Sequence, residues 1–130
     1  MFPKEIEIIL SRHLASCLAM PMFIINPSGE LVFYNETAEP ILGRRFADTG
    51  ELPVHEWTSA FSRLDGQDPA SSPGERPFVD ELLTRRPVQL GLWRHGANGE
   101  RHPVEITTFP IIGQADRHLG TVVVIWEPGE

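Results

Sequence analysis

Cysteine is almost absent from this sequence, since Cys17 is the single thiol. A disulfide bond within the chain and a zinc site of the Cys-x-x-Cys type are therefore excluded. Basic residues are scarce as well: eleven Lys and Arg stand against eighteen Asp and Glu, for a net charge of −7. Because such a surface repels a phosphate backbone, the composition argues against nucleic acid as a partner.

Long apolar runs are also missing. No stretch approaches the roughly 20 residues that cross a bilayer. The first ten residues, MFPKEIEIIL, carry acidic side chains where a secretory signal would carry basic ones. We therefore expect a cytoplasmic protein that does not contact a membrane, and the length of 130 residues suits one domain with a modest core.

Signatures of catalysis are lacking too. The sequence has no G-x-S-x-G, no H-E-x-x-H and no glycine-rich phosphate loop. Cys17 falls within a helical apolar stripe, which is not where an activated nucleophile with an orienting histidine is expected. The residues therefore give no support for an enzyme.

What is present starts with a hairpin pattern at residues 20–34. The apolar run at residues 22–25, MFII, predicts a strand covered on both faces. Asn26 to Gly29, with sequence NPSG, supplies turn chemistry, because proline presets φ, asparagine bonds its own backbone and glycine tolerates positive φ. Residues 31–34, LVFY, predict the returning strand.

A short capped helix is predicted next, over residues 36–42. Asn35 can cap its first turn, and Gly43 can end it in the left-handed conformation. This order of parts resembles the start of PAS sensor domains, whose pattern is an apolar strand, D-x-x-G, an apolar strand and N-x-x-A-x-x-x-[LF]-G. Asn26 stands where the family more often has Asp, which makes the same local bond. The matches are Gly29, Asn35, Ala38, Leu42 and Gly43.

Two more helices are expected before the last third of the chain. Helical spacing within residues 52–64 predicts one, with Trp57 and Phe61 turned inward. Residues 65–74 consist of turn and loop residues that, taken alone, would also suit an interdomain linker. Residues 76–86 predict the second helix. This region is similar to a segment of many PAS domains of bacterial signalling proteins, with matches at Asp65, Gly66, Pro69, Glu75, Pro77, Leu82, Pro87 and Val88.

The last third predicts antiparallel sheet. Strands at residues 88–95 and 102–109 flank Asn98-Gly99, a strong hairpin signal. Residues 119–126 are so apolar that they predict a central strand. This segment is similar to the closing hairpin and central strand of PAS domains.

The resemblance spans residues 20–127 and implies an α+β fold of the PAS type. It implies a five-stranded antiparallel sheet in the order 2-1-5-4-3, with short helices on one face and an N-terminal flanking helix on the other. The expected organisation is a flanking helix at residues 1–19, the PAS domain at 20–127 and a tail at 128–130.

The flanking helix, residues 3–19, shows two apolar faces. The narrower one contains Ile8, Ala15 and Ala19, which are either a second packing face or incidental surface residues. Two faces predict a helix that lies on its own sheet and also meets another chain, as PAS flanking helices often do. We expect a homodimer through the broad stripe of Ile6, Ile9, Leu10, His13, Leu14 and Cys17.

The resemblance also implies a concavity between sheet and helices. Its expected lining is nearly all apolar, so it is either a filled core or a pocket for a small apolar ligand. The candidate ligand-binding residues are Phe23, Ile25, Tyr34, Leu42, Phe46, Trp57, Phe61, Phe78, Leu82, Leu90, Leu92, Val104, Ile106, Thr108 and Val123, with Val32, Ile41 and Ile125 beside them.

The residues argue against the cofactors that PAS domains are known to hold. A flavin adduct requires a reactive cysteine in an N-C-R-F-L-type motif, whereas Cys17 lies in the flanking helix. Val104 and Ile106 stand where amide contacts to the flavin are expected. Haem requires an axial imidazole, and residues 76–86 contain no histidine. His55 precedes a different helix, and the identity of any cofactor stays unknown.

His95 and His102 flank the predicted hairpin, but two imidazoles without a third ligand are a weak metal site. After the central strand many PAS domains carry a D-[IV]-T motif that leads to an effector, whereas this sequence ends Glu127-Pro128-Gly129-Glu130. We expect a dimeric signal-sensing or protein-interaction module that signals through a separate protein effector. The alternatives are a small isomerase-like pocket enzyme, which requires acid or base groups in the cavity, and a purely structural dimerisation domain.

Overall fold

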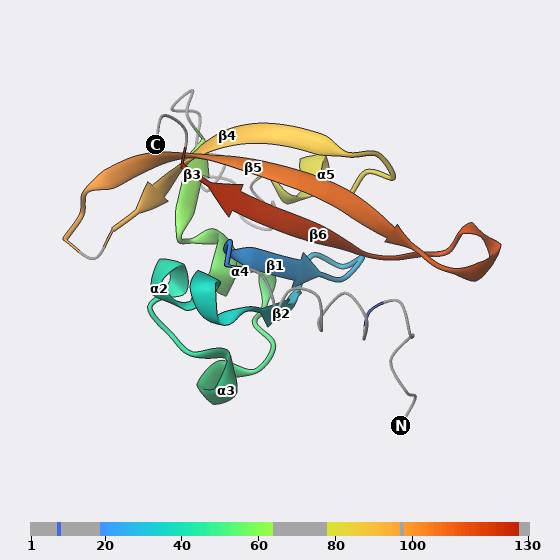
Figure 1. Ribbon diagram of the computed structural model, residues 1–130, viewed down its shortest axis with the longest axis horizontal. Coiled ribbons are helices and arrows are strands. Elements are labelled where there is room, and N and C mark those ends of the chain that lie inside the picture. The colour runs from blue at the N-terminus through green and yellow to red at the C-terminus, as the bar shows by residue number, and fades with distance from the viewer. Residues whose placement is uncertain (1–7, 9–18, 64–77, 97, 128–130) are drawn as a thin grey trace.

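The computed structural model describes residue 8 and residues 19–63, 78–96 and 98–127. These residues form an antiparallel sheet of six strands in the order β2-β1-β6-β5-β4-β3 (Figure 1). The prediction of five strands is therefore wrong. The neighbours of the five expected strands are nevertheless as predicted, because the additional strand, β3 (Phe61–Arg63), is added at the free edge of β4.

The first hairpin has the local structure that its sequence predicts. β1 (Met22–Ile25) and β2 (Leu31–Tyr34) are buried along their whole length. In the turn, the Asn26 side-chain oxygen accepts hydrogen bonds from the backbone amides of Ser28 at 3.0 Å and Glu30 at 2.9 Å. Gly29 has φ of 88°, a conformation that glycine adopts without steric cost.

A bulge in this hairpin overturns the predicted position of Val32. Ile24 pairs with Phe33 while Ile25 pairs with Leu31, so that Val32 is an extra residue in β2. A bulge changes the alternation of side chains between the two faces. Val32 therefore packs with the residues on the outer face of the sheet, away from the concavity that it was expected to line.

The capped helix after β2 is confirmed, although it begins as a 3-10 turn. η1 (Glu36–Ala38) leads directly into α2 (Glu39–Leu42). The Asn35 side-chain oxygen accepts from the backbone amides of Ala38 at 3.1 Å and Met22 at 3.0 Å. Gly43 ends α2 with φ of 71°, in the left-handed conformation.

The helix predicted within residues 52–64 is shorter than expected. After α3 (Phe46–Thr49), α4 (Val54–Thr58) ends before Phe61, which belongs to β3 and pairs with Arg94. An apolar spacing over so few residues suits either a helix or a strand. Here the open backbone edge of β4 favours a strand, because the hydrogen-bonding groups of both segments are satisfied.

The helix predicted at residues 76–86 is also shorter, since α5 spans Val79–Leu82. The final strands are β4 (Val88–His95), β5 (Arg101–Ile112) and β6 (His118–Trp126), with η3 (Gln114–Asp116) between the last two. The predicted Asn98-Gly99 hairpin joins β4 to β5. β6 lies between β1 and β5, which confirms the prediction of a central strand.

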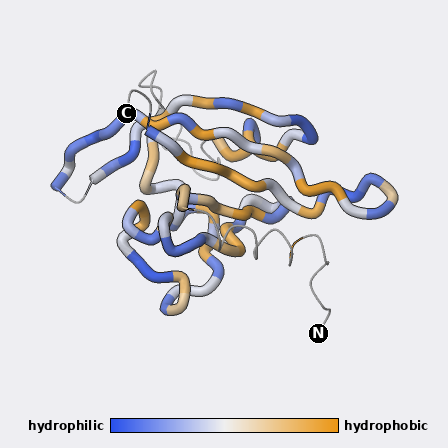
Figure 2. The backbone as a smooth tube through the Cα atoms, viewed as in Figure 1, coloured by the Kyte–Doolittle hydropathy of each residue, from blue (hydrophilic) through white to orange (hydrophobic). Residues whose placement is uncertain are grey.

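The two faces of the sheet carry separate groups of buried side chains. The inner face packs against the helices, and α2, α3 and α4 gather beside β1 and β2 (Figure 1). Hydrophobic residues follow the strands, whereas the ends of the long hairpins are hydrophilic (Figure 2). The outer cluster contains Ile8, Met22, Ile24, Val32, Phe33, Ile111 and Val122.

Ile8 packs on the outer face of the sheet. It is 8% exposed, and a Cβ placed on Gly120 of β6 would lie 3.6 Å from its Cδ1 atom. The interpretation of Ile8 as an incidental surface residue is therefore wrong. Residues 6, 9, 10, 13, 14 and 17, which form the predicted dimer stripe, and the loop at residues 65–74 lie outside the described residues.

Candidate functional site

Aromatic rings fill the space between the sheet and the helices. The Phe23 ring of β1 lies 6.3 Å from that of Tyr34, 5.8 Å from Trp57 and 6.1 Å from Phe61. Phe78 lies 5.9 Å from Trp57 and 6.2 Å from Phe61. All these contacts are edge to face, the arrangement that the charge distribution of aromatic rings favours. We call these five residues the aromatic core.

Trp57 connects this core to the first hairpin. Its indole N–H donates a buried hydrogen bond of 2.9 Å to the Gly29 carbonyl oxygen. The indole is 1% exposed, so this bond removes the cost of burying a polar N–H group. Within the described ranges, every buried side-chain nitrogen or oxygen has a hydrogen-bond partner.

Very little space remains in the core. The volume of the gap among its side chains that a water molecule can occupy is about 0 Å³. Ligand pockets of proteins are usually larger, at roughly 300–1,000 Å³. Of the two possibilities that the sequence left open, the described conformation corresponds to the filled core. The residues around the gap are Phe23, Trp57, Phe61, Phe78, Leu82, Leu92, Ile106, Val123 and Ile125.

The candidate residues do come together in space. All of them except Thr108 belong to the inner cluster or pack against it. Thr108 is fully buried beside them, and its hydroxyl accepts from the Val88 amide at 3.2 Å. Whether any of these residues bind a ligand stays a prediction. The candidate list lacks five buried members of the cluster, namely Leu31, Ala38, Leu52, Val79 and Ile125, of which only Ile125 was expected beside the candidates.

Leu52 shows why such residues are hard to find. It forms an isolated β-bridge with Leu31, in which each backbone N–H donates to the carbonyl of the other at 2.9 Å. A bridge of a single residue leaves no periodic pattern in the sequence. Ala38 left a usable signal, because it stands at a matched position of the N-x-x-A pattern and is fully buried.

The family model of the PAS domain matches residues 19–127. The chain belongs to the PAS domain family. PAS domains are signal-sensing and interaction modules, and the predicted resemblance is confirmed over almost the whole sequence. A search of curated proteins finds no match.

Solved structures agree with this fold. The PAS domain of Bordetella pertussis BvgS has a TM-score of 0.74 at 15% identity, covering 97% of this chain and 89% of that one. A Rhodobacter sphaeroides LOV protein has a TM-score of 0.70 at 15% identity, covering 97% and 70%. The phage VqmA-DPO complex has a TM-score of 0.60 at 15% identity, covering 93% and 52%. At such identities the likeness concerns the fold alone.

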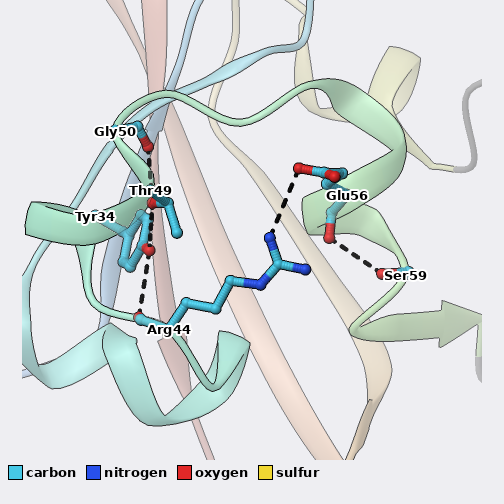
Figure 3. Close-up of polar contacts among 6 residues, drawn as sticks. All are labelled: Tyr34, Arg44, Thr49, Gly50, Glu56 and Ser59. Atoms are coloured by element: carbon cyan, nitrogen blue, oxygen red, sulfur yellow. Dashed lines mark hydrogen bonds and ion pairs between the residues drawn. The ribbon is translucent and has the colours of Figure 1, made fainter.

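The polar groups near the core of this PAS domain bind its own backbone. The Tyr34 hydroxyl donates to the Arg44 carbonyl oxygen at 3.2 Å and lies 2.8 Å from the Thr49 hydroxyl, where either oxygen can be the donor. The Thr49 hydroxyl in turn lies 2.9 Å from the Gly50 carbonyl (Figure 3). These bonds attach the segment from Arg44 to Gly50 to the sheet, and they leave the hydroxyls with structural partners.

His95 and His102 have separate polar partners. The His95 ring bonds the Ser62 hydroxyl at 2.9 Å, and the His102 ring lies 3.9 Å from a Glu100 carboxylate oxygen. His55 is exposed on α4. In the part of the chain that the structure describes, no three His, Cys, Asp or Glu side chains are placed to hold a metal ion. No helix of these residues is long and apolar enough to cross a bilayer.

Proposed function

We propose that this PAS domain is a dimeric interaction module that relays a signal through contacts with a separate protein. The filled aromatic core supports this proposal above the others. A core of five interlocking rings transmits a displacement between helices and sheet without a bound molecule, because closely packed interiors have little room to deform. A resident apolar ligand would require the rings around Phe23 to move apart.

The outer face of the sheet supports the dimer. Ile8 of the flanking segment already packs on this face. Phe109 and Trp126 also point outward, since Phe109 pairs with the outer residue Val122 and Trp126 lies two residues after Val124 on β6, and they are 41% and 36% exposed. Ile8 and these exposed aromatic side chains therefore lie on one face of the sheet, where a second chain would bury the exposed rings.

The dimer is tested by changing the predicted stripe of the flanking helix. Ile9→Asp and Leu10→Asp should each give monomers, because an unpaired carboxylate at an apolar interface is costly to bury. The measurement is multi-angle light scattering. Ser11→Asp is the matched control, since its helical spacing places it off the stripe, and it should leave a dimer. Dimers in both stripe variants would contradict the assignment.

Native mass spectrometry of the purified protein, with its absorption spectrum, tests the filled core. We expect two bare chains and no visible absorbance. An excess mass that disappears on denaturation would instead identify a bound molecule. In that case the function would change from an interaction module to a ligand sensor whose aromatic core opens.

A further inference from the structure

A cleft lies outside the aromatic core, between α2, α4 and the end of β4. Ile41 and Leu42 of α2 form part of its wall, and Arg44, Glu56 and Arg94 contribute charged side chains. The cleft is open to solvent and has a volume of about 280 Å³. It therefore has room for a small molecule, which the core does not.

Arg94 is the unusual residue of this cleft. It occupies a core-facing position of β4, two residues after Leu92, which is 1% exposed. The Arg94 side chain is 23% exposed, and its guanidinium contacts Glu127 at 3.4 Å. Among the described residues, this is its one polar side-chain partner. A guanidinium offers five N–H donors in a planar fork, so most of them are available to an anion.

Arg44 provides a second cation. Its guanidinium extends across the cleft to Glu56 of α4 at 3.7 Å (Figure 3). Both side chains are about half exposed, at 52% and 49%, so this pair is weak and a ligand can replace it. The His95 ring, also in the lining, bonds the Ser62 hydroxyl at 2.9 Å. The lining thus carries two arginines and one glutamate, and Glu127, which contacts Arg94 from outside the lining, balances the second arginine until a ligand displaces it.

We propose that this cleft binds a small organic anion. The Arg94 guanidinium donates to its carboxylate or phosphate oxygens, the geometry for which arginine is best suited. Arg44 adds a second positive charge, and the short apolar part of the molecule lies against Ile41 and Leu42. This proposal goes beyond the interaction module, and it does not depend on the dimer.

The site is one hydrogen bond away from the aromatic core. The Arg44 carbonyl oxygen accepts from the Tyr34 hydroxyl at 3.2 Å, and Tyr34 packs against Phe23. A ligand that moves the Arg44 backbone thus acts on a hydrogen bond of β2. Binding in the cleft is thereby coupled to the sheet.

Titration of ¹⁵N-labelled protein with sodium hexanoate tests the site, with hexyl phosphate and 1-hexanol as parallel probes. We expect saturable shifts of the amides of Leu42, Gly43, Arg94 and Gly96 with the anions and none with the alcohol. The anion that binds with the higher affinity shows whether the site prefers a carboxylate or a phosphate. Equal shifts with 1-hexanol, or shifts away from these amides, would overturn the proposal.

Charge-neutralising variants sharpen the test. Arg94→Gln should weaken hexanoate binding by about tenfold or more, because charge-assisted hydrogen bonds are lost. Arg45→Gln is the matched control, since Arg45 is exposed and lies outside the cleft, and it should change affinity by less than about twofold. Equal affinities of these two variants would refute the role of Arg94.

Glu127→Gln is expected to raise the affinity for hexanoate, and a partly unfolded variant would not bind more tightly. The substitution removes the carboxylate that occupies the Arg94 guanidinium, at an exposed position. Hexanoate should then bind several-fold more tightly. Unchanged or weaker binding by this variant would contradict the site. The outcome is separate from that of the dimer test, because oligomeric state and anion affinity are measured independently.

Discussion

Both sides of the sheet carry tryptophan, which is buried on the inner side and partly exposed on the outer face. On the inner side, Trp57 is 1% exposed and its indole N–H binds a backbone carbonyl at 2.9 Å. On the outer face, Trp126 is 36% exposed and its N–H reaches the Thr107 hydroxyl at a long 3.4 Å. The inner face is completed by helices of the same chain, whereas the outer face still presents aromatic surface.

The buried inner side chains therefore contribute to the stability of the fold, and the exposed outer ones are available for association. Burying an aromatic side chain contributes several kcal/mol only when water is excluded from it and its polar atoms are bonded. The inner side chains meet both conditions. Phe109 and Trp126 on the outer face meet them only when something covers these rings, so their contribution depends on what binds there.

Among the variants that test this comparison, Trp57→Ala is expected to change the free energy of unfolding the most. Removing a fully buried indole should lower the free energy of unfolding by about 3–5 kcal/mol, because it leaves a cavity and an unpaired Gly29 carbonyl. Chemical denaturation measures the change. Trp126→Ala is the matched control and should cost less than about 1 kcal/mol in the monomer. Equal losses would remove the distinction between the faces.

Asn35→Ala should have the next largest effect. Its side chain accepts from the Met22 and Ala38 amides and donates to the Met20 carbonyl at 2.8 Å, and the residue is 3% exposed. Leaving buried backbone groups unpaired should cost about 2–3 kcal/mol in the free energy of unfolding. Asn26→Ala removes similar bonds in an exposed turn.

For Asn26→Ala, water replaces the lost partners, and the cost should be about 1 kcal/mol or less. Thermal unfolding of both variants provides the measurement. If Asn26→Ala proves as damaging as Asn35→Ala, burial is not the reason for the strength of the Asn35 cap.

A smaller effect is expected from Tyr34→Phe, which keeps the ring and removes the hydroxyl. Loss of the bonds to Arg44 and Thr49 should cost about 1 kcal/mol. Thr107→Val, which removes the exposed contact to Trp126, should cost about 0.5 kcal/mol or less. Hydrogen exchange at the Thr49 and Gly50 amides should rise in Tyr34→Phe alone, and unchanged exchange would show that the hydroxyl does not hold this segment.

Local chemistry made much of the fold predictable. The turn at Asn26, the Asn35 cap and the end of α2 at Gly43 depend on bonds within a few residues, and such bonds leave recognisable residue types. The candidate core was recognised for the same kind of reason, because inward positions on strands alternate. Val32 was misplaced because a bulge interrupts that alternation.

Contacts between distant segments were beyond this reasoning. β3 forms because β4 offers a free edge to it, with Phe61 opposite Arg94, 33 residues later in the sequence. The cleft of Arg44 and Arg94 was missed for a similar reason. Its two cations are far apart in the chain, and no spacing rule relates them.

The amino-acid sequence by itself determined the strand periodicity, the turns, the caps and the membership of the PAS family, since each arises from neighbouring residues. Only the tertiary structure decided that the aromatic rings of Phe23, Trp57 and Phe78 close on one another and leave no room for water. Periodicity reports which residues face inward, but the remaining volume depends on how side chains from several segments interlock.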